Sequence, residues 1–416
     1  MIRKNIALVL GGTIPHISLI KKLKERGYYT ILVDYLNNPP AKSYADEHIQ
    51  ESTLDKELVL DIAKKCAAEI VISTCVDQAN SVCCYVAEKL GLPHPYSYQT
   101  SLDVTDKSRM KSIMMENGIP TSRYCHVQTL DEFNDASFRF PLMVKPADSN
   151  SANGVKKVSN VDELKEYFPI AKKFSRNGYV ILEEFVEGVE VSVYCLIIDN
   201  KAHILMAQER LSVIEGEKKV IKCYASFAPA RISSAAMQKC EIIATNIANA
   251  FHLNNTPLFF QGIIKGDDIS VIEFAARVGG GISSETIKYS TGFDIIDAAI
   301  DSFLNKPINI DNWHPMTKKY AVNQIYGVNG TYSHTDGVEK LLDDGIVENI
   351  SFYKKEGDVI DDSRASSSRI GVMVISGTTE AEIRKKIHSA FQTINCYDKD
   401  GKSIIRQDLN LDVLGI

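Results

Sequence analysis

The chain has 416 residues, of which 44% are hydrophobic and 24% are charged, and its formal net charge at pH 7 is −6. This composition is typical of a globular protein of two to four domains and excludes an intrinsically disordered chain. The mild charge, without a block of lysines and arginines, argues against nucleic-acid binding, and no apolar run approaches the 18 residues of a membrane-spanning helix. These properties fit a cytoplasmic enzyme.

The nine cysteines are scattered and include no Cys-x-x-Cys pair, which is typical of reduced thiols in a reducing compartment. No neighbouring motif selects one of them as a nucleophile, so a catalytic cysteine stays a minor alternative. The nine histidines show no spacing typical of zinc ligands, which argues against a histidine zinc site.

The first hundred residues alternate between short apolar runs and segments of helical periodicity. The apolar runs predict strands at 6–10, 30–34 and 70–74. The periodic segments predict helices at 17–26, 54–67 and 78–90. Such alternation predicts a parallel sheet covered by helices on both faces. Gly11-Gly12-Thr13 and Asp34 imitate a dinucleotide-binding motif, but the G-x-G-x-x-G spacing is missing, so nicotinamide binding is only a minor alternative.

A break at Leu92-Pro93-His94-Pro95 indicates a domain boundary. The next helix begins with an N-cap at Thr105 or Asp106, and Gly118 and Pro120 end it. It carries Lys107 in its first turn. A lysine in that position is usually a solvated surface residue, so only the motifs that follow give it weight.

The segment 140–146 reads as an apolar strand with Lys145 near its exit. A single compact cation at the end of a strand is suited to neutralising a phosphate. The loop that follows contains small residues, among them Ser149, Ser151 and Gly154. Backbone N–H groups and hydroxyls of such a loop can close over phosphate oxygens. The alternative is an ordinary polar turn.

The segment 179–190 predicts a buried strand that ends in two carboxylates, an aromatic residue and a glycine turn. Its last eight residues are Glu183, Glu184, Phe185, Val186, Glu187, Gly188, Val189 and Glu190. Backbone N–H and C=O groups at such a strand end need partners, which a bound ring edge can supply.

The segment 257–281 predicts a β-hairpin followed by three glycines. Residues 259–265 and 269–274 are apolar and are separated by a three-residue polar turn. Pairing the residues that flank this turn sets Gln261 directly opposite Glu273. A bulge in the turn would shift this register by one residue.

Directly opposed side chains of a sheet lie about 5 Å apart, so Gln261 and Glu273 can chelate one hard cation. Arg277, shortly after the second strand, can neutralise a transferring phosphoryl group. The alternative, a solvent-edged hairpin, is disfavoured because an unpaired carboxylate in an apolar strand is costly.

The remaining chain predicts further regular elements. Helices are expected at 235–251, 281–292, 293–304 and 379–391. Strands are expected at 320–327 and 369–376. In the polar loop 361–369, Arg364 or Arg369 can reach a substrate carboxylate, although an ordinary surface charge is the favoured interpretation.

Taken together, these motifs resemble the ATP-grasp superfamily. Glu273-x-x-x-Arg277 resembles its Glu-x-Asn-x-Arg metal-binding end, with Ala275 in place of the Asn and Gln261 in place of the preceding carboxylate. Carbamoyl phosphate synthetases are similar in having Gln at the first position. Lys107 matches the lysine that opens the DK-x-x-x-K signature.

The resemblance implies a role for each residue that carries it. Lys107 and Lys145 would contact ATP phosphates, and Ser149, Ser151 and Gly154 would belong to a mobile lid. Glu183 would accept the adenine amino group, the backbone of Glu184 and Val186 would pair with the ring edge beside Phe185, and Glu190 would hold the ribose. Gln261 and Glu273 would bind Mg²⁺, with Mn²⁺ as the alternative. Arg277 and Lys145 would be the catalytic residues.

The resemblance also implies an α/β and α+β architecture in the order of biotin carboxylase-like members. We expect an N-terminal parallel α/β (pre-ATP-grasp) domain at 1–95 and a two-lobed ATP-grasp unit at 96–312, with a mobile lid subdomain at about 140–200. A C-terminal α+β lobe would follow at 313–416.

The activity implied by the resemblance is that of bacterial carboxylate–amine ligases, including L-amino acid ligases. Such an enzyme forms an amide through an acyl phosphate and releases ADP and phosphate. A bicarbonate-activating carboxylase or carbamoyl-type enzyme is second, favoured by Gln261, and a non-catalytic nucleotide-binding sensor is third, suggested by Ala275. The expected partners are a small carboxylate, a small amine and a second copy in a homodimer. No linear motif identifies the substrates.

Overall fold

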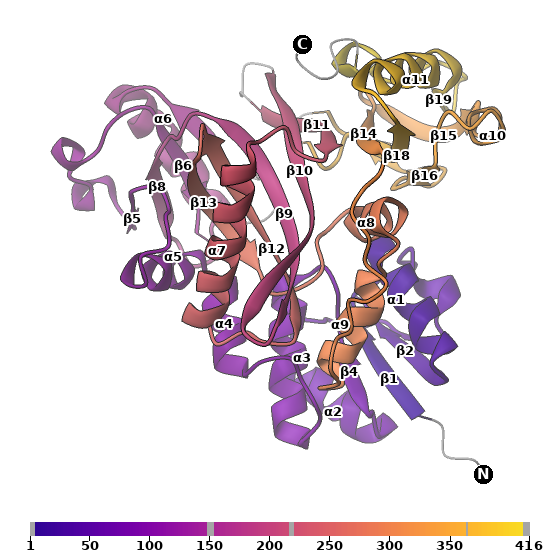
Figure 1. Ribbon diagram of the computed structural model, residues 1–416, viewed down its shortest axis with the longest axis horizontal. Coiled ribbons are helices and arrows are strands. Elements are labelled where there is room, and N and C mark those ends of the chain that lie inside the picture. Colours follow the sequence, from indigo (N-terminus) through magenta and orange to yellow (C-terminus); the bar gives the residue numbers. More distant parts are fainter. Residues whose placement is uncertain (1–4, 148–153, 216–219, 363–364, 411–416) are drawn as a thin grey trace.

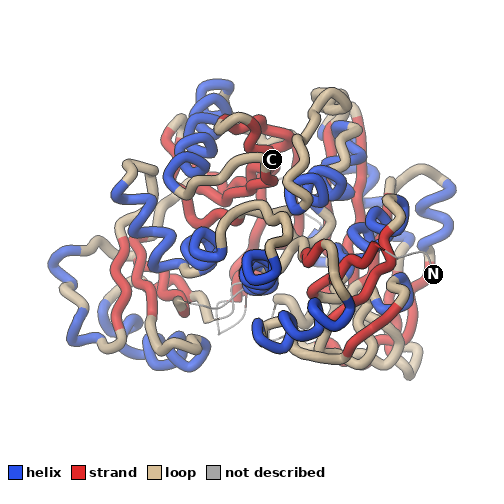
Figure 2. The backbone as a smooth tube through the Cα atoms, turned by 90° about the horizontal axis from the view of Figure 1, so that it is seen from below, coloured by secondary structure: helices blue, strands red, loops and turns tan. Residues whose placement is uncertain are grey.

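A computed structural model describes residues 5–147, 154–215, 220–362 and 365–410. Figure 1 shows the N-terminal unit, a small sheet around β5, β6 and β8, the long central strands β9, β10 and β12, and a C-terminal part around β14, β15 and β18. In Figures 1 and 2 the small sheet and the N-terminal unit lie on opposite sides of the molecule. Within the described ranges, no helix is long and apolar enough to cross a membrane.

The N-terminal unit contains a four-stranded parallel sheet of order β3-β2-β1-β4. Its strands are β1 (Asn5–Leu10), β2 (Tyr28–Val33), β3 (Glu47–Ile49) and β4 (Ile70–Ile72). The helices between them are α1 (Ile14–Glu25), α2 (Lys56–Cys66) and α3 (Asp77–Leu90). The predicted parallel sheet is confirmed; β3, short and only partly buried, was not predicted. The strand order reverses beside β1, and this switch point is the position at which such sheets commonly bind ligands.

The central sheet has eight antiparallel strands of order β13-β12-β9-β10-β11-β14-β18-β16. Its strands are β9 (Val189–Ile198), β10 (Lys201–Glu215), β11 (Val220–Ala228), β12 (Thr256–Lys265), β13 (Asp268–Ala275), β14 (Lys319–Tyr326), β16 (Asn349–Phe352) and β18 (Arg369–Gly377). Strands β9, β10 and β11 were not predicted from the sequence. These strands connect the hairpin to the C-terminal strands in one continuous sheet.

A smaller antiparallel sheet has the order β5-β8-β6-β7. It consists of β5 (Tyr124–Val127), β6 (Leu142–Pro146), β7 (Lys156–Val158) and β8 (Val180–Glu184). Helix α6 (Val161–Phe174) packs on β6, β7 and β8, and its Leu164 and Phe168 join Val144 and Leu182 in the core of this unit.

The C-terminal part adds a three-stranded sheet of order β17-β15-β19. Its strands are β15 (Gly330–Asp336), β17 (Val359–Ile360) and β19 (Asn395–Asp398). Helices α10 (Val338–Asp343) and α11 (Glu380–Thr393) accompany it, and α11 packs on β14 and β18 of the central sheet.

The other helices join these units. They are α4 (Tyr98–Thr105), α5 (Lys107–Glu116), α7 (Ser234–Ala250), α8 (Ser283–Thr291) and α9 (Ile295–Phe303). Helix α7 covers one face of the central sheet, against β9, β10, β12 and β13. Helix α9 packs on α1 and β4, so one hydrophobic cluster extends from the N-terminal sheet into α8 and α9.

Candidate active site

The β12–β13 hairpin places Gln261 directly opposite Glu273, the pair predicted from the sequence, but through a different register. The predicted three-residue turn is wrong, because Lys265 pairs with Asp268 across a two-residue turn. A β-bulge at Ile272 then shifts the register again, and the two differences cancel.

The bulge also decides which face of the sheet receives Glu273. Ile269 and Val271, four and two residues before it, pack in the apolar core beneath α7. Regular alternation would send Glu273 to that apolar face as well. The extra residue at Ile272 turns Glu273 to the other face, where Gln261 lies.

Lys107 forms an ion pair with Glu273, with 3.2 Å between Nζ and Oε2. Asp106 caps α5 by accepting hydrogen bonds from the backbone N–H groups of Ser108 and Arg109, which sets the helix start that presents Lys107. The Lys107 ammonium lowers the pKa of Glu273 although partial desolvation of the carboxylate opposes it, and Lys145 and Arg277 contribute in the same direction as Lys107. Of the three predicted cations, Lys107 contacts Glu273 directly, whereas Lys145 contacts Glu183 and Arg277 contacts Asp77.

Arg210 of β10 belongs to the same group, although the sequence analysis did not identify it. Its Nε lies 2.7 Å from Oε1 of Glu190. With the Gln261 amide turned to satisfy its hydrogen bonds, its nitrogen donates to Glu273 Oε1 (3.1 Å) and its oxygen accepts from Arg210 Nη1 (3.2 Å). Arg210 lies two residues after Gln208, so in a strand both side chains share one face of the sheet. This spacing could have identified Arg210 only if β10 had been predicted as a strand.

The residues present fit a divalent cation at Gln261 and Glu273, since an amide oxygen and a carboxylate are ligands that Mg²⁺ accepts. In the described ranges no group of three His, Cys, Asp or Glu side chains gathers as a metal site. Phosphate and water oxygens would complete the coordination. Chelation by both side chains requires the Gln261 amide to rotate, because its oxygen now faces Arg210.

Glu183 is a buried carboxylate that already holds two lysines. Its side chain is 3% exposed; Lys111 Nζ lies 2.7 Å from Oε1, while Lys145 and Ser122 also donate to it. Burial disfavours the charge, but Lys145 and Lys111 outweigh burial and lower the pKa of Glu183 to about 2. Its predicted contact with adenine stays a prediction, and any such contact shares the carboxylate with these lysines.

Two backbone N–H groups of the predicted adenine hinge already form hydrogen bonds within the protein. The backbone N–H of Glu184 donates to Arg123 O (2.9 Å), and that of Phe185 donates to Pro141 O (3.0 Å). Val186, the next residue, forms no hydrogen bond within the described ranges, so its backbone groups are available to a ligand.

Ser149 and Ser151, predicted for the lid, lie outside the described residues. Gly154 is described and has a φ of +73°. A Cβ there would lie 2.8 Å from Pro146 Cγ and 2.9 Å from Phe174 Cβ, so both conformation and packing require glycine at this position.

The glycine turn after β1 does not offer a dinucleotide cradle. The Gly12 N–H already donates to Asp34 Oδ2 (2.7 Å), and a Cβ at Gly12 would lie 2.5 Å from Pro39 Cβ. A pyrophosphate would meet a carboxylate and a proline ring where the motif needs free N–H groups. The nicotinamide alternative is therefore not supported.

His16 is fully buried under this turn and is held as a neutral ring. The Ser73 hydroxyl donates to Leu10 O (2.7 Å), so it accepts from His16 Nε2–H (3.2 Å). Nδ1 then accepts from the Thr13 hydroxyl (2.8 Å). Burial lowers the pKa of His16 to about 4.

We expect the pH dependence of stability to report this buried ring. The unfolded chain takes up a proton on His16 near pH 6.5 and the folded chain only near pH 4. The free energy of unfolding should fall by about 3 kcal/mol as the pH falls through this window. Urea unfolding at several pH values should show a shallower decline for His16→Gln. Equal declines in wild type and variant would contradict the assignment.

Arg277, predicted to stabilise the phosphoryl group, is bound by Asp77 of α3. Its Nε and Nη2 each lie 2.6 Å from one oxygen of that carboxylate. The two residues are 200 positions apart, and no local pattern pointed to Asp77.

Arg369, weighed as a substrate contact, donates from Nε to the Tyr326 hydroxyl (3.2 Å). Arg364 lies outside the described residues.

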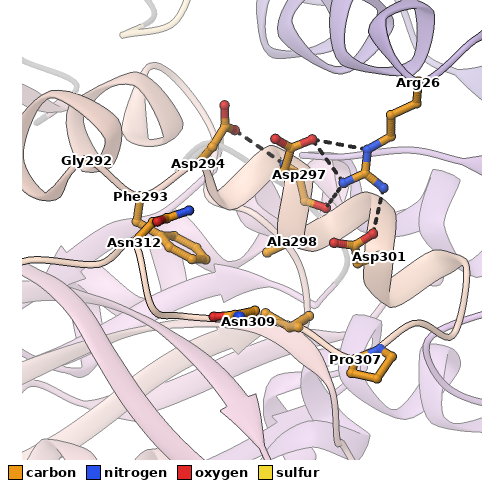
Figure 3. A pocket seen from close by; sticks show the side chains of 11 residues that line it. Arg26, Gly292, Phe293, Asp294, Asp297, Ala298, Asp301, Pro307, Asn309 and Asn312 are labelled. Atoms are coloured by element: carbon orange, nitrogen blue, oxygen red, sulfur yellow. Dashed lines mark hydrogen bonds and ion pairs between the residues drawn. The ribbon is translucent and has the colours of Figure 1, made fainter.

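A separate cavity of about 260 Å³ lies where α1 meets α9 (Figure 3). Beside it, Arg26 is bound by Asp297 and Asp301 of α9. None of the predicted site residues lines this cavity.

Comparisons with known proteins cover most of the chain. The family profile "D-ala D-ala ligase C-terminus" matches residues 113–256, and "L-amino acid ligase C-terminal domain 2" matches residues 325–397. The L-arginine-specific L-amino acid ligase of Bacillus subtilis is 22% identical, over 84% of this chain and 85% of its own. A formate-dependent phosphoribosylglycinamide formyltransferase of Prochlorococcus marinus is 23% identical, over 89% and 92%.

Solved structures show the same fold. The L-amino acid ligase of Bacillus licheniformis superposes with a TM-score of 0.80 at 19% identity, covering 96% of this chain and all of its own. The biotin carboxylase domain of the Hydrogenobacter thermophilus 2-oxoglutarate carboxylase, in complex with MgADP and bicarbonate, has a TM-score of 0.78 at 15% identity, covering 99% and 94%. These likenesses confirm the predicted fold class.

Proposed function

We propose that this chain, which belongs to the ATP-grasp superfamily of ligases, joins a small carboxylate to an amine at the expense of ATP. The observation that carries the proposal is the ion pair of Lys107 with Glu273, which lies opposite Gln261. Lys111, one turn further along the same helix, pairs with Glu183, which also binds Lys145. A polyphosphate and a divalent cation need such a group of cations and hard oxygen ligands in one place.

The proposed reaction has two steps. A carboxylate oxygen of the first substrate attacks the γ-phosphorus of ATP, the bond to the β-phosphate oxygen breaks, and ADP leaves. The amine nitrogen then attacks the carbonyl carbon of the acyl phosphate, the bond from that carbon to the phosphate oxygen breaks, and the ammonium-like nitrogen loses its proton to solvent. Phosphorylation is needed because a bare carboxylate has no adequate leaving group.

In this proposal the protein positions reactants and neutralises charge. Lys107 and Lys145 release their carboxylates and contact phosphate oxygens, and Arg277 faces the transferring phosphoryl group. The backbone groups of Val186 form hydrogen bonds with the edge of the adenine ring, and the Glu190 carboxylate binds the ribose hydroxyls. A bound Mg²⁺ would supply charge stabilisation at Gln261 and Glu273.

We also propose the division into a pre-ATP-grasp domain at 1–95, an ATP-grasp unit at 96–312 and a C-terminal lobe at 313–416. The loops that follow β1 and β4 are the proposed acceptor side, because Asp77, which follows β4, binds Arg277. The central sheet continues from the second part into the third, so the lobes share one framework.

Activation of bicarbonate is the second candidate, and Gln261 is the observation that favours it. The similar biotin carboxylase domain structure is a complex with MgADP, ADP and bicarbonate. In the leading candidate the carboxylate belongs to an organic acid such as an amino acid.

Phosphate release from ATP and Mg²⁺ tests these functions. We expect release when amino acids are supplied in pairs, because one provides the carboxylate and the other the amine, and little release without them. Mass spectrometry should find the amide product. Release that requires only bicarbonate and an acceptor would favour the second candidate, whereas nucleotide binding without release under any condition would favour a sensor.

A further inference from the structure

We infer that Asp77 is a positioning residue for phosphoryl transfer: it fixes the orientation of Arg277 and so makes the N-terminal unit part of the reacting site. This inference rests on the proposed function for its kinetic consequence. Its structural content, a guanidinium held in one orientation by Asp77, stands separately and can be measured without turnover.

The contact is a fork between the two side chains. Arg277 donates from Nε to Oδ1 and from Nη2 to Oδ2 of Asp77, both at 2.6 Å. The side chains are only 12% and 25% exposed. Two parallel charge-assisted bonds fix the plane of a guanidinium as well as its place, which a single contact does not do.

Other contacts complete the orientation. Arg277 Nη1 donates to Val278 O (2.9 Å), and the guanidinium carbon lies 5.1 Å from the centre of the Phe259 ring. The Tyr96 hydroxyl donates to Ala276 O (3.0 Å), so a residue near the N-terminal unit also holds the backbone beside Arg277. A guanidinium has five N–H donors, and these bonds use three. One N–H on Nη1 and one on Nη2 remain for a ligand.

A purely structural clamp does not account for this pair. Removing two charges from water costs free energy that their attraction barely repays, so a buried ion pair is weak evidence of a stabilising role. The same two parts of the chain are already joined by Arg26, whose Nη1 lies 2.6 Å from Asp301 Oδ1 (Figure 3), and by the hydrophobic cluster that reaches α9.

The position of Arg277 places the pair at the proposed site. Arg277 follows β13 by two residues, and its guanidinium lies over the ring of Phe259, which is two residues before Gln261 on β12 and therefore on the same face of the sheet. Asp77 begins α3, directly after the loop that follows β4 at the switch point of the N-terminal sheet. Under the proposed function an acceptor substrate held by this loop would lie next to Asp77, and Asp77 would couple its position to Arg277.

The kinetic test compares Asp77→Asn with Asp301→Asn. Both changes remove one carboxylate charge from an arginine pair between the same two parts of the chain, but only Asp77 holds Arg277. We expect Asp77→Asn to lower kcat about 10- to 100-fold with the KM for ATP nearly unchanged, as for other supporting partners of site residues. Asp77→Glu, which keeps the fork, should recover most of kcat, and Asp301→Asn should behave as wild type. Equal effects of Asp77→Asn and Asp301→Asn, or a kcat of Asp77→Asn within about twofold of wild type, would overturn the inference.

A second readout separates this inference from the proposed function. In protein labelled with ¹⁵N-arginine, the Nε–H resonance of Arg277, assigned by its loss in Arg277→Lys, should exchange slowly with solvent in wild type and in Asp301→Asn. It should exchange fast in Asp77→Asn. If wild type releases no phosphate with any substrate, the proposed function fails and this exchange rate still decides whether Asp77 positions Arg277. Fast exchange of the Arg277 Nε–H in wild type would overturn the inference. If Asp77→Asn does not fold, Asp77→Glu takes its place. Slow exchange and near-normal kcat in Asp77→Glu would support the inference, and loss of both the slow exchange and the kcat would overturn it.

Discussion

The Glu273→Ala variant should release phosphate from ATP about 10³-fold more slowly than the wild-type chain, because several kcal/mol of charge stabilisation depend on its carboxylate. Glu273 forms an ion pair with Lys107 and lies opposite Gln261. Without it, a divalent cation loses its only charged protein ligand in the proposed site. The fold should remain, since Glu273 is on the polar face of the hairpin and the side chain is 36% exposed. A phosphate-release assay under saturating ATP measures the effect.

Glu209→Ala is the matched control. Glu209 lies on β10 of the same sheet and is likewise paired with a cation, since Arg231 donates to it at 2.8 and 2.9 Å. It follows Gln208 and precedes Arg210, so it points to the opposite face from the proposed site. This variant should keep near-wild-type turnover. Wild-type turnover in Glu273→Ala would show that the metal assignment is wrong.

The second large effect concerns stability. Glu183→Ala should lower the free energy of unfolding by about 3–5 kcal/mol, because it leaves Lys111 and Lys145 buried without their counter-charge. The side chains of Lys111 and Lys145 are 4% and 14% exposed, so water compensates little. Urea unfolding at pH 7 measures the difference.

Two further variants isolate the cause. Adding Lys111→Met to Glu183→Ala removes one of the stranded charges, so the double variant should lose less than the sum of the single changes. Glu187→Ala removes a carboxylate four residues away that is 76% exposed, and it should change stability by no more than about 0.5 kcal/mol. Equal losses in Glu183→Ala and Glu187→Ala would exclude the buried-charge explanation.

Local chemistry alone was enough for much of the fold. Strands and helices of the N-terminal unit follow from apolar runs and helical periodicity, because each element shows its own repeat in a short window. The hairpin from β12 to β13 was visible for the same reason. The sequence also revealed the individual motifs, since each depends on a few adjacent residues around Lys107, Lys145, Glu183 or Glu273.

The pairings among those motifs were decided by the tertiary structure. The sequence could not show that the β-bulge at Ile272 moves Glu273 from the apolar face to the polar face, because a bulge depends on both strands. Strand β10 was missed, and Arg210 with it.

The sequence by itself determined which residue types were available and the secondary structure that carries them. Only the tertiary structure decided the partners: Lys111 meets Glu183 across 72 positions and Asp77 meets Arg277 across 200. Such contacts form where separate units pack together, and charge attraction between side chains this far apart leaves no periodic trace in the chain. The motifs of the site can therefore be recognised in the sequence, but their relative positions are determined only when the sheets pack.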